Sequence, residues 1–373
     1  MIKVVLSIRS LDIGGAERQF IELVKHIDKT KFDVTVCTMY GGVQEKIIED
    51  IPNISYYNLQ KTGRYDLYSF YKNYSSLLEK INPDIIYSFL GEMNLFSLWC
   101  KPKKTKIIWG FRASNMDLQQ YGKVPQILFL LQKILSKKVH TIITNSHASV
   151  SFHKTHGFTM SKSVIVPNGI DTDKFQRNEK SRKDFRDKYN LKETDIAISI
   201  VARIDHIKGY LILSHAAREI LDALDDVYFF SVGGGDEKIK KECENILGTY
   251  NRTKFIWLGN QENIQDFYSG FDISLSSSFG EGFSNSIAEA MACECPCVVT
   301  DVGESSMIVG DIGIAVKPNS INDLKNGLLQ MIAKDFQKLG KKSRERIIEN
   351  FSIEKMVKRT EKEVYELAKR DRR

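Results

Sequence analysis

The chain has 373 residues, of which 42% are hydrophobic, and this length suits two globular domains of ordinary size. Its formal net charge of +7 favours anionic substrates or an anionic membrane surface, but the excess is too small to indicate a nucleic-acid partner. No segment has the roughly 20 apolar residues of a membrane-spanning helix, and the N-terminus lacks the length and cleavage site of a signal peptide, so we expect a cytoplasmic protein.

Strand-like runs alternate with longer amphipathic stretches in the first half of the chain. These runs span residues 3–8, 32–38, 85–89, 106–111 and 141–145. The alternation of strands and helices predicts a parallel, doubly wound α/β sheet. We place this first domain at residues 1–170.

A glycine loop follows the first of these strands. Gly14 and Gly15 lie between the strand and a helix whose apolar side chains, from Phe20 to Ile27, recur at helical spacing. Amides of this loop are placed to meet a phosphate. The pattern is not G-x-G-x-x-G, so the sequence disfavours a nicotinamide cofactor.

The stretch from Pro125 to Lys138 is apolar and ends in lysines. A helix of this composition can rest on a membrane surface, but the commoner interpretation is a helix packed in the core. The sequence leaves both interpretations open.

The strand pattern restarts after a turn-rich segment at residues 164–175. Further strands are predicted at 196–201, 228–232, 254–258, 273–276 and 297–300. They indicate a second doubly wound domain at residues 171–354, followed by a basic helix at about 355–373. Ligands of such sheets bind beyond the carboxyl ends of the strands, so two facing domains would form a cleft.

Loops with cations and glycines follow the first strands of this second domain. Arg203 and Lys208 are placed to clamp a diphosphate, arginine through its planar fork and lysine as a point charge, although two basic residues in a loop are more often simply solvated. Gly234 lies in a glycine run that allows close approach of a ligand, and Asn260 follows the next strand.

The strand at 273–276 leads into a helix through a loop with a carboxylate on each side. Gly282 allows a tight turn, and Ser284 is a natural N-cap before a helix terminus that attracts anions. Glu281 and Glu289 are placed to accept hydrogen bonds from the hydroxyls of a sugar and a ribose. The pattern predicts a sugar-nucleotide site, against the alternative of an ordinary loop with solvated glutamates.

Cys293, Cys295 and Cys297 raise the question of a metal site. These cysteines lie in a strand-like run, and no fourth ligand of suitable spacing lies nearby. We expect no metal, and we expect all six cysteines of the chain to be reduced thiols.

Taken together, these motifs resemble the retaining glycosyltransferases of family 4, which have the GT-B fold. The resemblance covers almost the whole chain. Glu281 and Glu289 are similar to the E-x7-E motif of that family, and the other matches are residues 14–17, 167–171, 203 with 208, and 233–236. It implies two Rossmann-like domains, a nucleoside-diphosphate sugar bound mainly by the second, acceptor contacts on the first, a last helix that crosses back onto the first domain, and neither cofactor nor divalent metal.

The resemblance also implies roles for individual residues. Arg203 and Lys208 would hold the diphosphate and Glu281 the donor sugar, and these three are the expected catalytic residues. Retention in this family is thought to proceed by front-face attack through an oxocarbenium-like state that is stabilised electrostatically. Glu289 would bind the ribose, and the remaining donor-binding residues would be Gly14, Gly15, Arg112, Gly234, Asn260, Gly282, Phe283 and Ser284.

Arg112 is also where the chain departs from the family. Many members have a histidine there, and an arginine cannot act as a base at neutral pH. Residues 301–313 are similar to members that build bacterial surface polysaccharides, so we expect a saccharide acceptor that is lipid-linked, with peripheral membrane contact. Two alternatives remain, a non-hydrolysing sugar-nucleotide epimerase of the same fold and a non-catalytic accessory subunit.

Overall fold

The computed structural model describes residues 1–61, 63, 66–112 and 122–370. Contacts along the chain divide it into two compact units. The first unit comprises Met1–Gly169 with Ile353–Arg373, and the second comprises Ile170–Ser352. The sequence analysis placed the end of the first domain at residue 170 and the end of the second at residue 354.

The first unit is built on a parallel sheet in which the described residues form seven strands, in the order β3-β2-β1-β4-β5-β6-β7. Central strands such as β4 are buried along their whole length, which is typical of a sheet covered on both faces. The strands are β1 (Ile2–Ile8), β2 (Phe32–Thr38), β3 (Ile54–Asn58), β4 (Ile85–Phe89), β5 (Lys106–Phe111), β6 (Thr141–Thr144) and β7 (Ser163–Ile165).

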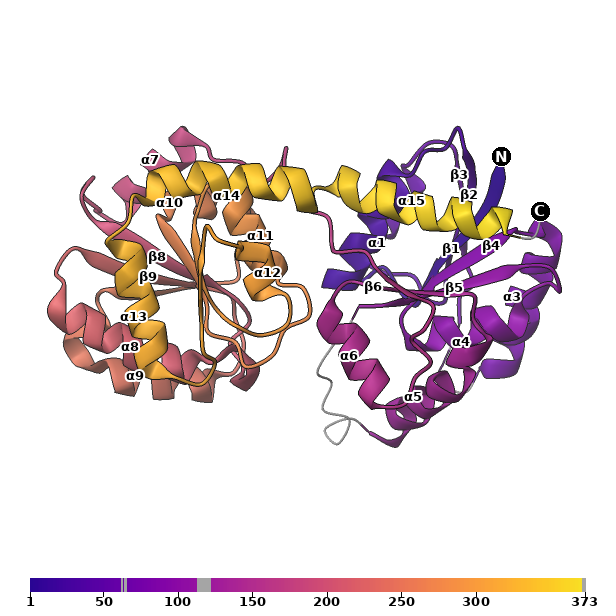
Figure 1. Ribbon diagram of the computed structural model, residues 1–373, viewed down its shortest axis with the longest axis horizontal. Coiled ribbons are helices and arrows are strands. Elements are labelled where there is room, and N and C mark those ends of the chain that lie inside the picture. The colour runs from indigo at the N-terminus through magenta and orange to yellow at the C-terminus, as the bar shows by residue number, and fades with distance from the viewer. Residues whose placement is uncertain (62, 64–65, 113–121, 371–373) are drawn as a thin grey trace. The chain divides into compact units, whose positions relative to one another are not determined.

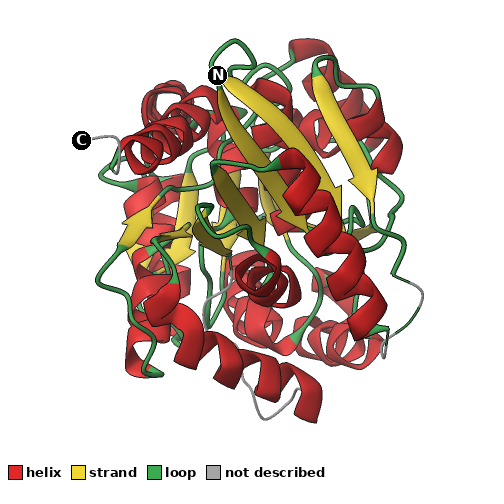
Figure 2. Ribbon diagram, turned by 90° about the vertical axis from the view of Figure 1, so that its right-hand side faces the viewer, coloured by secondary structure: helices red, strands yellow, loops and turns green. Residues whose placement is uncertain are grey.

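Helices cover both faces of this sheet (Figures 1 and 2). One face packs against α1 and α15, and the other against α3, α4, α5 and α6. The helices are α1 (Gly15–His26), α2 (Glu45–Glu49), α3 (Leu67–Ile81), α4 (Gly91–Cys100), α5 (Lys123–Leu135), the 3₁₀ helix η2 (Ser136–Lys138), α6 (His147–Thr155) and α15 (Ile353–Lys369).

The second unit has the same design. Its described strands form a parallel sheet in the order β10-β9-β8-β11-β12-β13. One face packs against α7, α10, α11, α12 and α14, and the other against α8, α9 and α13. The strands are β8 (Ile196–Val201), β9 (Val227–Val232), β10 (Phe255–Gly259), β11 (Ile273–Ser276), β12 (Cys297–Thr300) and β13 (Ile314–Val316). The helices are α7 (Glu179–Lys188), the 3₁₀ helix η3 (His206–Lys208), α8 (Tyr210–Ala223), α9 (Glu237–Asn251), α10 (Ile264–Gly270), α11 (Asn285–Ala292), α12 (Ser305–Val309), α13 (Ile321–Ile332) and α14 (Phe336–Phe351).

A buried ion cluster ties α7 to this sheet. Asp272, at the start of β11, accepts hydrogen bonds from Arg182 at 2.7 Å and from Arg186 at 3.2 Å. The same carboxylate accepts the amide of Ala197 at 2.9 Å. The carboxylate therefore joins two strands and a helix at the edge of the sheet opposite to the carboxyl ends of β8 and β11.

The interpretation of the cysteines needs correction, and the structure describes the packing of α5, which the sequence left open. Cys293, Cys295 and Cys297 do not alternate along one strand, because Cys293 closes α11 and Cys297 begins β12, and all three are buried in the core. Helix α5 is packed on one face only: Phe129 and Gln132 are buried, whereas several apolar side chains on its other face are exposed. Within the part of the chain that the structure describes, no helix combines the length and apolarity needed to cross a membrane.

Candidate active site

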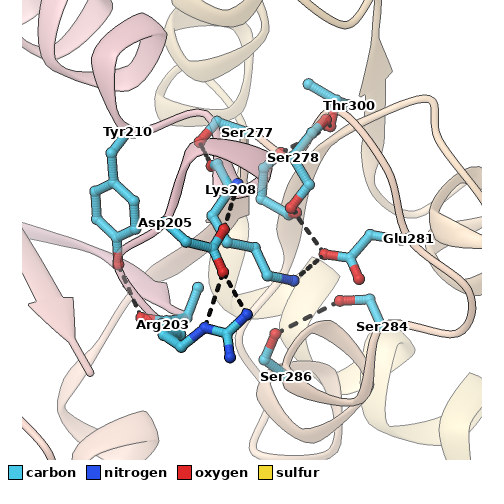
Figure 3. Close-up of polar contacts among 12 residues, drawn as sticks. Arg203, Asp205, Lys208, Tyr210, Ser277, Ser278, Glu281, Ser284, Ser286 and Thr300 are labelled. Carbon is cyan, nitrogen blue, oxygen red and sulfur yellow. Dashed lines mark hydrogen bonds and ion pairs between the residues drawn. The ribbon is translucent and has the colours of Figure 1, made fainter. Parts of the chain in front are cut away.

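The strand order of the second sheet reverses between β8 and β11, which lie side by side although they are far apart in sequence. Ligands of open α/β sheets bind at such a switch point, beyond the carboxyl ends of the strands. The loops that follow these two strands carry Arg203, Lys208 and Glu281 (Figure 3).

The loop after β8 is shaped by a side chain that the sequence-based prediction overlooked. Asp205 caps η3 by accepting the amide of Lys208 at 3.2 Å. It also accepts Nε of Arg203 at 2.8 Å and forms an ion pair with its Nη2 at 2.7 Å. The guanidinium of Arg203 is thus oriented while its side chain stays 77% exposed, which leaves it accessible to a ligand.

The loop after β11 is locked against the loop after β8. Ser277 donates through Oγ to the carbonyl of Lys208 at 2.8 Å, and the amide of Phe279 donates to the carbonyl of Ile207 at 2.7 Å. Gly209 makes this contact possible, because its φ of +66° favours glycine and a Cβ there would lie within 3.0 Å of the Ser277 carbonyl oxygen.

Lys208 and Glu281 form an ion pair in this junction. Lys208 Nζ lies 2.6 Å from Glu281 Oε1, and the two side chains are 23% and 13% exposed. Ser278 donates to the same carboxylate oxygen at 2.7 Å, and Thr300 holds the carbonyl of Ser278 at 2.6 Å (Figure 3). The pair is therefore fixed beyond the carboxyl ends of the strands by groups from the loop after β11 and from β12.

Helix α11 begins directly after this loop. Its N-cap, Ser284, makes no side-chain capping bond, unlike the N-caps of α6 and α9. A helix N-terminus carries partial positive charge, so this end of α11 favours an anionic ligand. Gly303 closes the back of the loop: its φ is +59°, a Cβ there would meet the carbonyl of Glu281, and the next amide, of Glu304, donates to the carbonyl of Gly282 at 2.9 Å.

Two expected donor residues of this segment, Phe283 and Glu289, are buried. Glu289 lies on α11 and is only 4% exposed. The side chain of Phe283 belongs to the core, where its ring packs edge-on against Phe351 at 5.6 Å. Phe283 can therefore contact a donor through its backbone rather than its ring.

The glycine run after β9 lies beside the loop that carries Arg203. The amide of Ile204 donates to the carbonyl of Gly234 at 2.9 Å, and Gly234 donates to the side chain of Asn260 at 2.8 Å. The loops after β8, β9 and β10 are therefore hydrogen-bonded to one another at the carboxyl ends of their strands. The structure thus brings Arg203, Gly234 and Asn260 together at the carboxyl ends of these strands.

The other expected residues lie in the first unit. Gly14 is the N-cap of α1 and Gly15 its first residue, at the end of the loop that follows β1. Arg112 follows β5, donates to the Tyr87 hydroxyl at 3.0 Å and to Asn168 Oδ1 at 3.3 Å, and lies over the Phe89 ring at 5.0 Å. Burial raises the pKa of Tyr87 although Arg112 opposes this, so the phenol remains a neutral acceptor for the guanidinium.

A pocket of about 420 Å³ opens beside Arg112 within the first unit. It lies beyond the carboxyl ends of β4 and β5 and has both charged and apolar walls. Arg9 and Glu92 form an ion pair at 3.0 Å in its lining. The other lining residues are Leu90, Gly91, Asn94, Gly110, Phe111, Arg112, Pro125, Leu128, Phe129, Gln132, His153 and Phe158.

Asp205 and Ser278 are the polar site residues that the sequence-based prediction missed. Asp205 carried a usable signal, since an aspartate three positions before Lys208 is a typical N-cap. Ser278 carried none, because its role depends on which serine of the loop after β11 faces Glu281.

Two family models match the chain. The one described as "Glycosyltransferase Family 4" matches residues 13–174, and the one described as "Glycosyl transferases group 1" matches residues 181–352. The chain belongs to glycosyltransferase family 4.

Two curated relatives align with this glycosyltransferase over most of their length. It is 25% identical to the N-acetylgalactosamine-N,N'-diacetylbacillosaminyl-diphospho-undecaprenol 4-alpha-N-acetylgalactosaminyltransferase of Campylobacter jejuni, over 90% of this chain and 91% of that protein. It is 23% identical to the UDP-Gal:alpha-D-GlcNAc-diphosphoundecaprenol alpha-1,3-galactosyltransferase of Escherichia coli, over 92% of each.

A solved structure shares the fold of this glycosyltransferase. HepE of Anabaena, in complex with UDP and glucose, matches with a TM-score of 0.78 at 19% identity, over 98% of this chain and 100% of that one. The likeness identifies the two doubly wound units as the GT-B architecture, as expected from the sequence.

Proposed function

We propose that this glycosyltransferase retains anomeric configuration and moves a sugar from a nucleoside-diphosphate sugar to a lipid-linked saccharide in the synthesis of a surface polysaccharide or glycoconjugate. The observation that carries the proposal is the junction of β8 and β11, where Lys208, Glu281 and the N-terminus of α11 converge. Cations and a helix terminus suit a diphosphate, and a carboxylate suits the hydroxyls of a sugar.

The chemistry assigned to this junction needs no metal or cofactor. The bond between the anomeric carbon and the diphosphate oxygen breaks while the acceptor hydroxyl oxygen bonds to the same face of that carbon. The acceptor proton passes to the departing diphosphate oxygen. Arg203 and Lys208 stabilise the charge that develops on the diphosphate, and fixed cations of this kind provide most of the catalysis in such reactions.

Donor binding requires the ion pair to rearrange. Lys208 is held by Glu281 at 2.6 Å, so a diphosphate must compete with the carboxylate for the ammonium group. The donor offers a new polar partner to each member of the ion pair: its phosphate oxygens can bind Lys208, and its sugar hydroxyls can bind Glu281. Each charged group therefore exchanges one polar partner for another instead of losing it.

The acceptor is assigned to the pocket of the first unit. The names of both curated relatives describe acceptors carried on diphospho-undecaprenol. Arg9 and Arg112 line the pocket and can bind the phosphates or hydroxyls of such an acceptor, and its apolar wall fits a sugar ring or the first part of a lipid. This assignment implies that the enzyme works at the inner face of the cell membrane.

A thermal-shift screen without added metal tests the donor site. The ligands are UDP, GDP, ADP, CDP and their common sugar conjugates, because a ligand that binds the native state raises its melting temperature. We expect one nucleotide to stand out and the shift to disappear in Arg203→Ala. Arg218→Ala is the matched control, since Arg218 is a half-exposed arginine on α8 with an ion pair of its own. The absence of a shift with every nucleotide would contradict the donor site.

A transfer assay then tests the reaction. The preferred donor, labelled in its sugar, is incubated with undecaprenyl-diphosphate-linked saccharides, and the anomeric configuration of the product is read by NMR. Label in the lipid fraction with the donor's configuration supports the proposal. Isomerised donor without any acceptor would identify an epimerase instead, and an inverted product would exclude retention.

A further inference from the structure

The outer face of α5 is apolar and open to solvent. Ile127, Leu130 and Ile134 are 55%, 51% and 52% exposed, and Val124, one turn earlier, is 39% exposed. Their spacing of three to four residues places them on one side of the helix. We call these four residues the α5 face.

The helix is anchored by its opposite side. Phe129 packs against Phe152 and Phe158, with ring centroids 6.1 Å and 4.8 Å away, and Gln132 is buried next to it. α4 packs beside α5 in the same layer (Figure 1). The α5 face is therefore held on a rigid element, and its exposure is not a consequence of an unpacked helix.

The segment that carries the α5 face contains lysines but no acidic residue. Between Gly122 and Lys138 the chain has four lysines and no aspartate or glutamate. Lys123 begins α5, Lys133 lies in its last turn, and Lys137 and Lys138 follow in η2, and all four are exposed. Lysine stems can lie along an apolar surface while their ammonium groups reach outward.

We propose that the α5 face, with these four lysines, docks on the surface of an anionic lipid bilayer. A helix with an apolar face and flanking cations lies in the boundary between head groups and acyl chains, where both parts are satisfied. A second copy of this chain is the less suitable occupant, because it would bring the same lysines against each other. An anionic bilayer complements the charge and buries the apolar side chains.

Docking in this way would place the acceptor pocket next to the lipid. Pro125, Leu128 and Phe129 of the same helix line that pocket from its inner side. A lipid-linked substrate could then reach the pocket without leaving the membrane surface. The docking surface itself needs neither donor nor acceptor, so vesicle binding and sugar transfer can fail independently.

Co-flotation of the purified full chain with vesicles tests the proposal. The vesicles contain phosphatidylcholine alone or phosphatidylcholine with phosphatidylglycerol, at low and at high salt. We expect binding to the anionic vesicles, weakened by salt. Each lysine near such a surface contributes roughly a fivefold change in partitioning, so Lys137→Ser/Lys138→Ser should weaken binding roughly 25-fold. Leu130→Ser with Ile127→Ser and Ile134→Ser should weaken it more than tenfold.

Matched variants control for charge and for surface apolarity. Lys341→Ser/Lys342→Ser removes an equally exposed adjacent pair from α14, and Ile348→Ser removes an isoleucine of the same helix that is 41% exposed. Both should bind vesicles like the wild type, and all variants should keep the wild-type melting temperature, because the changed side chains are exposed.

Three outcomes would overturn the proposal. These are a wild type that stays in the vesicle-free fraction under all conditions, α5 variants that bind as the wild type does, and α14 variants that lose binding to the same degree. Concentration-dependent dimerisation that is abolished by the α5 changes, without vesicle binding, would assign the face to a second copy of the chain.

Discussion

The ammonium group of Lys208 lies 2.6 Å from Oε1 of Glu281, although 73 positions separate the two residues in the chain. Both side chains are mostly buried, and Ser278 donates to the same oxygen. The pair therefore holds two candidate catalytic groups in place before any donor is bound.

Removing either member should abolish most transfer. We expect Lys208→Ala and Glu281→Ala each to lower kcat/KM by two to three orders of magnitude, the usual effect of losing one fixed electrostatic group. Lys325→Ala is the control, because Lys325 forms an equally short ion pair with Glu219 on the helices α13 and α8. Transfer rates are compared after circular dichroism has verified folding. Near-normal transfer by either site variant would remove that residue from the mechanism.

Gly209→Ala should destabilise the second unit and impair donor binding. The new Cβ would meet the Ser277 carbonyl and separate the two loops that position Lys208. Gly248→Ala is a matched control, since its φ of +72° is equally left-handed but no heavy atom lies within 4 Å of the new Cβ. The control should lose about 1 kcal/mol of unfolding free energy, and Gly209→Ala clearly more. Equal losses in urea titrations would mean that the contact is not needed.

Arg112 should matter for transfer through contacts rather than proton exchange. Arg112→Ala should lower kcat/KM at least tenfold, whereas Tyr87→Phe, which removes one anchor of the guanidinium, should have a smaller effect. The pH–rate profiles of the wild type and of Arg112→Ala should show the same steps, because arginine does not titrate in this range. Unchanged kinetics of Arg112→Ala would show that the family histidine has no replacement here.

His153 should make the first unit sensitive to mild acid. Burial lowers the pKa of His153 to about 4, and its ring is stacked on Phe111 at 4.3 Å. Above pH 6.5 the histidine is neutral in both folded and unfolded chains and has no effect on pH dependence. As the pH falls from 6.5 towards 4, only the unfolded chain takes up the proton, so stability decreases by up to about 3 kcal/mol.

His153→Phe removes this contribution while keeping an aromatic ring. We expect the difference in unfolding free energy between wild type and variant to change between pH 7 and pH 4, with the wild type losing more. Guanidinium titrations at several pH values measure it. Parallel pH curves for the two proteins would contradict a neutral, buried histidine.

Asp272→Asn should be among the most damaging conservative changes in the second unit. It leaves Arg182 and Arg186 buried without their carboxylate, a situation that typically costs 3–5 kcal/mol. Glu237→Gln, which changes the exposed member of a pair with Lys240, should cost less than about 1 kcal/mol. Urea titration of both variants provides the comparison, and similar midpoints would argue against the ion cluster as a stabilising element.

The sequence predicted the central strands well because their apolar runs are nearly continuous. All ten strands expected from the sequence are present, most within one residue of their predicted limits. Among the described strands, the three that were missed, β3, β7 and β13, lie at sheet edges, where partial exposure leaves only a weak pattern.

The site was predictable where residue type and spacing carry the information. Arg203, Lys208, Glu281 and Glu289 could be singled out as candidates because each follows a predicted strand or lies in the first turns of the helix after it. Their partners could not, since the pairing of Lys208 with Glu281 depends on β8 lying beside β11. The exposed side of α5 could not be predicted either, because residues 127–131 are apolar all round the helix.

The first unit is assembled from two distant parts of the chain. Helix α15 supplies Ile353, Met356, Val357, Val364 and Leu367 to the same core as Phe20 and Leu23 of α1. During translation, the whole of the second unit leaves the ribosome before this helix does. The second unit can therefore complete its core early. The apolar surface of the first unit that α15 covers stays exposed until the end of synthesis, so we expect chaperones to bind this part of the nascent chain.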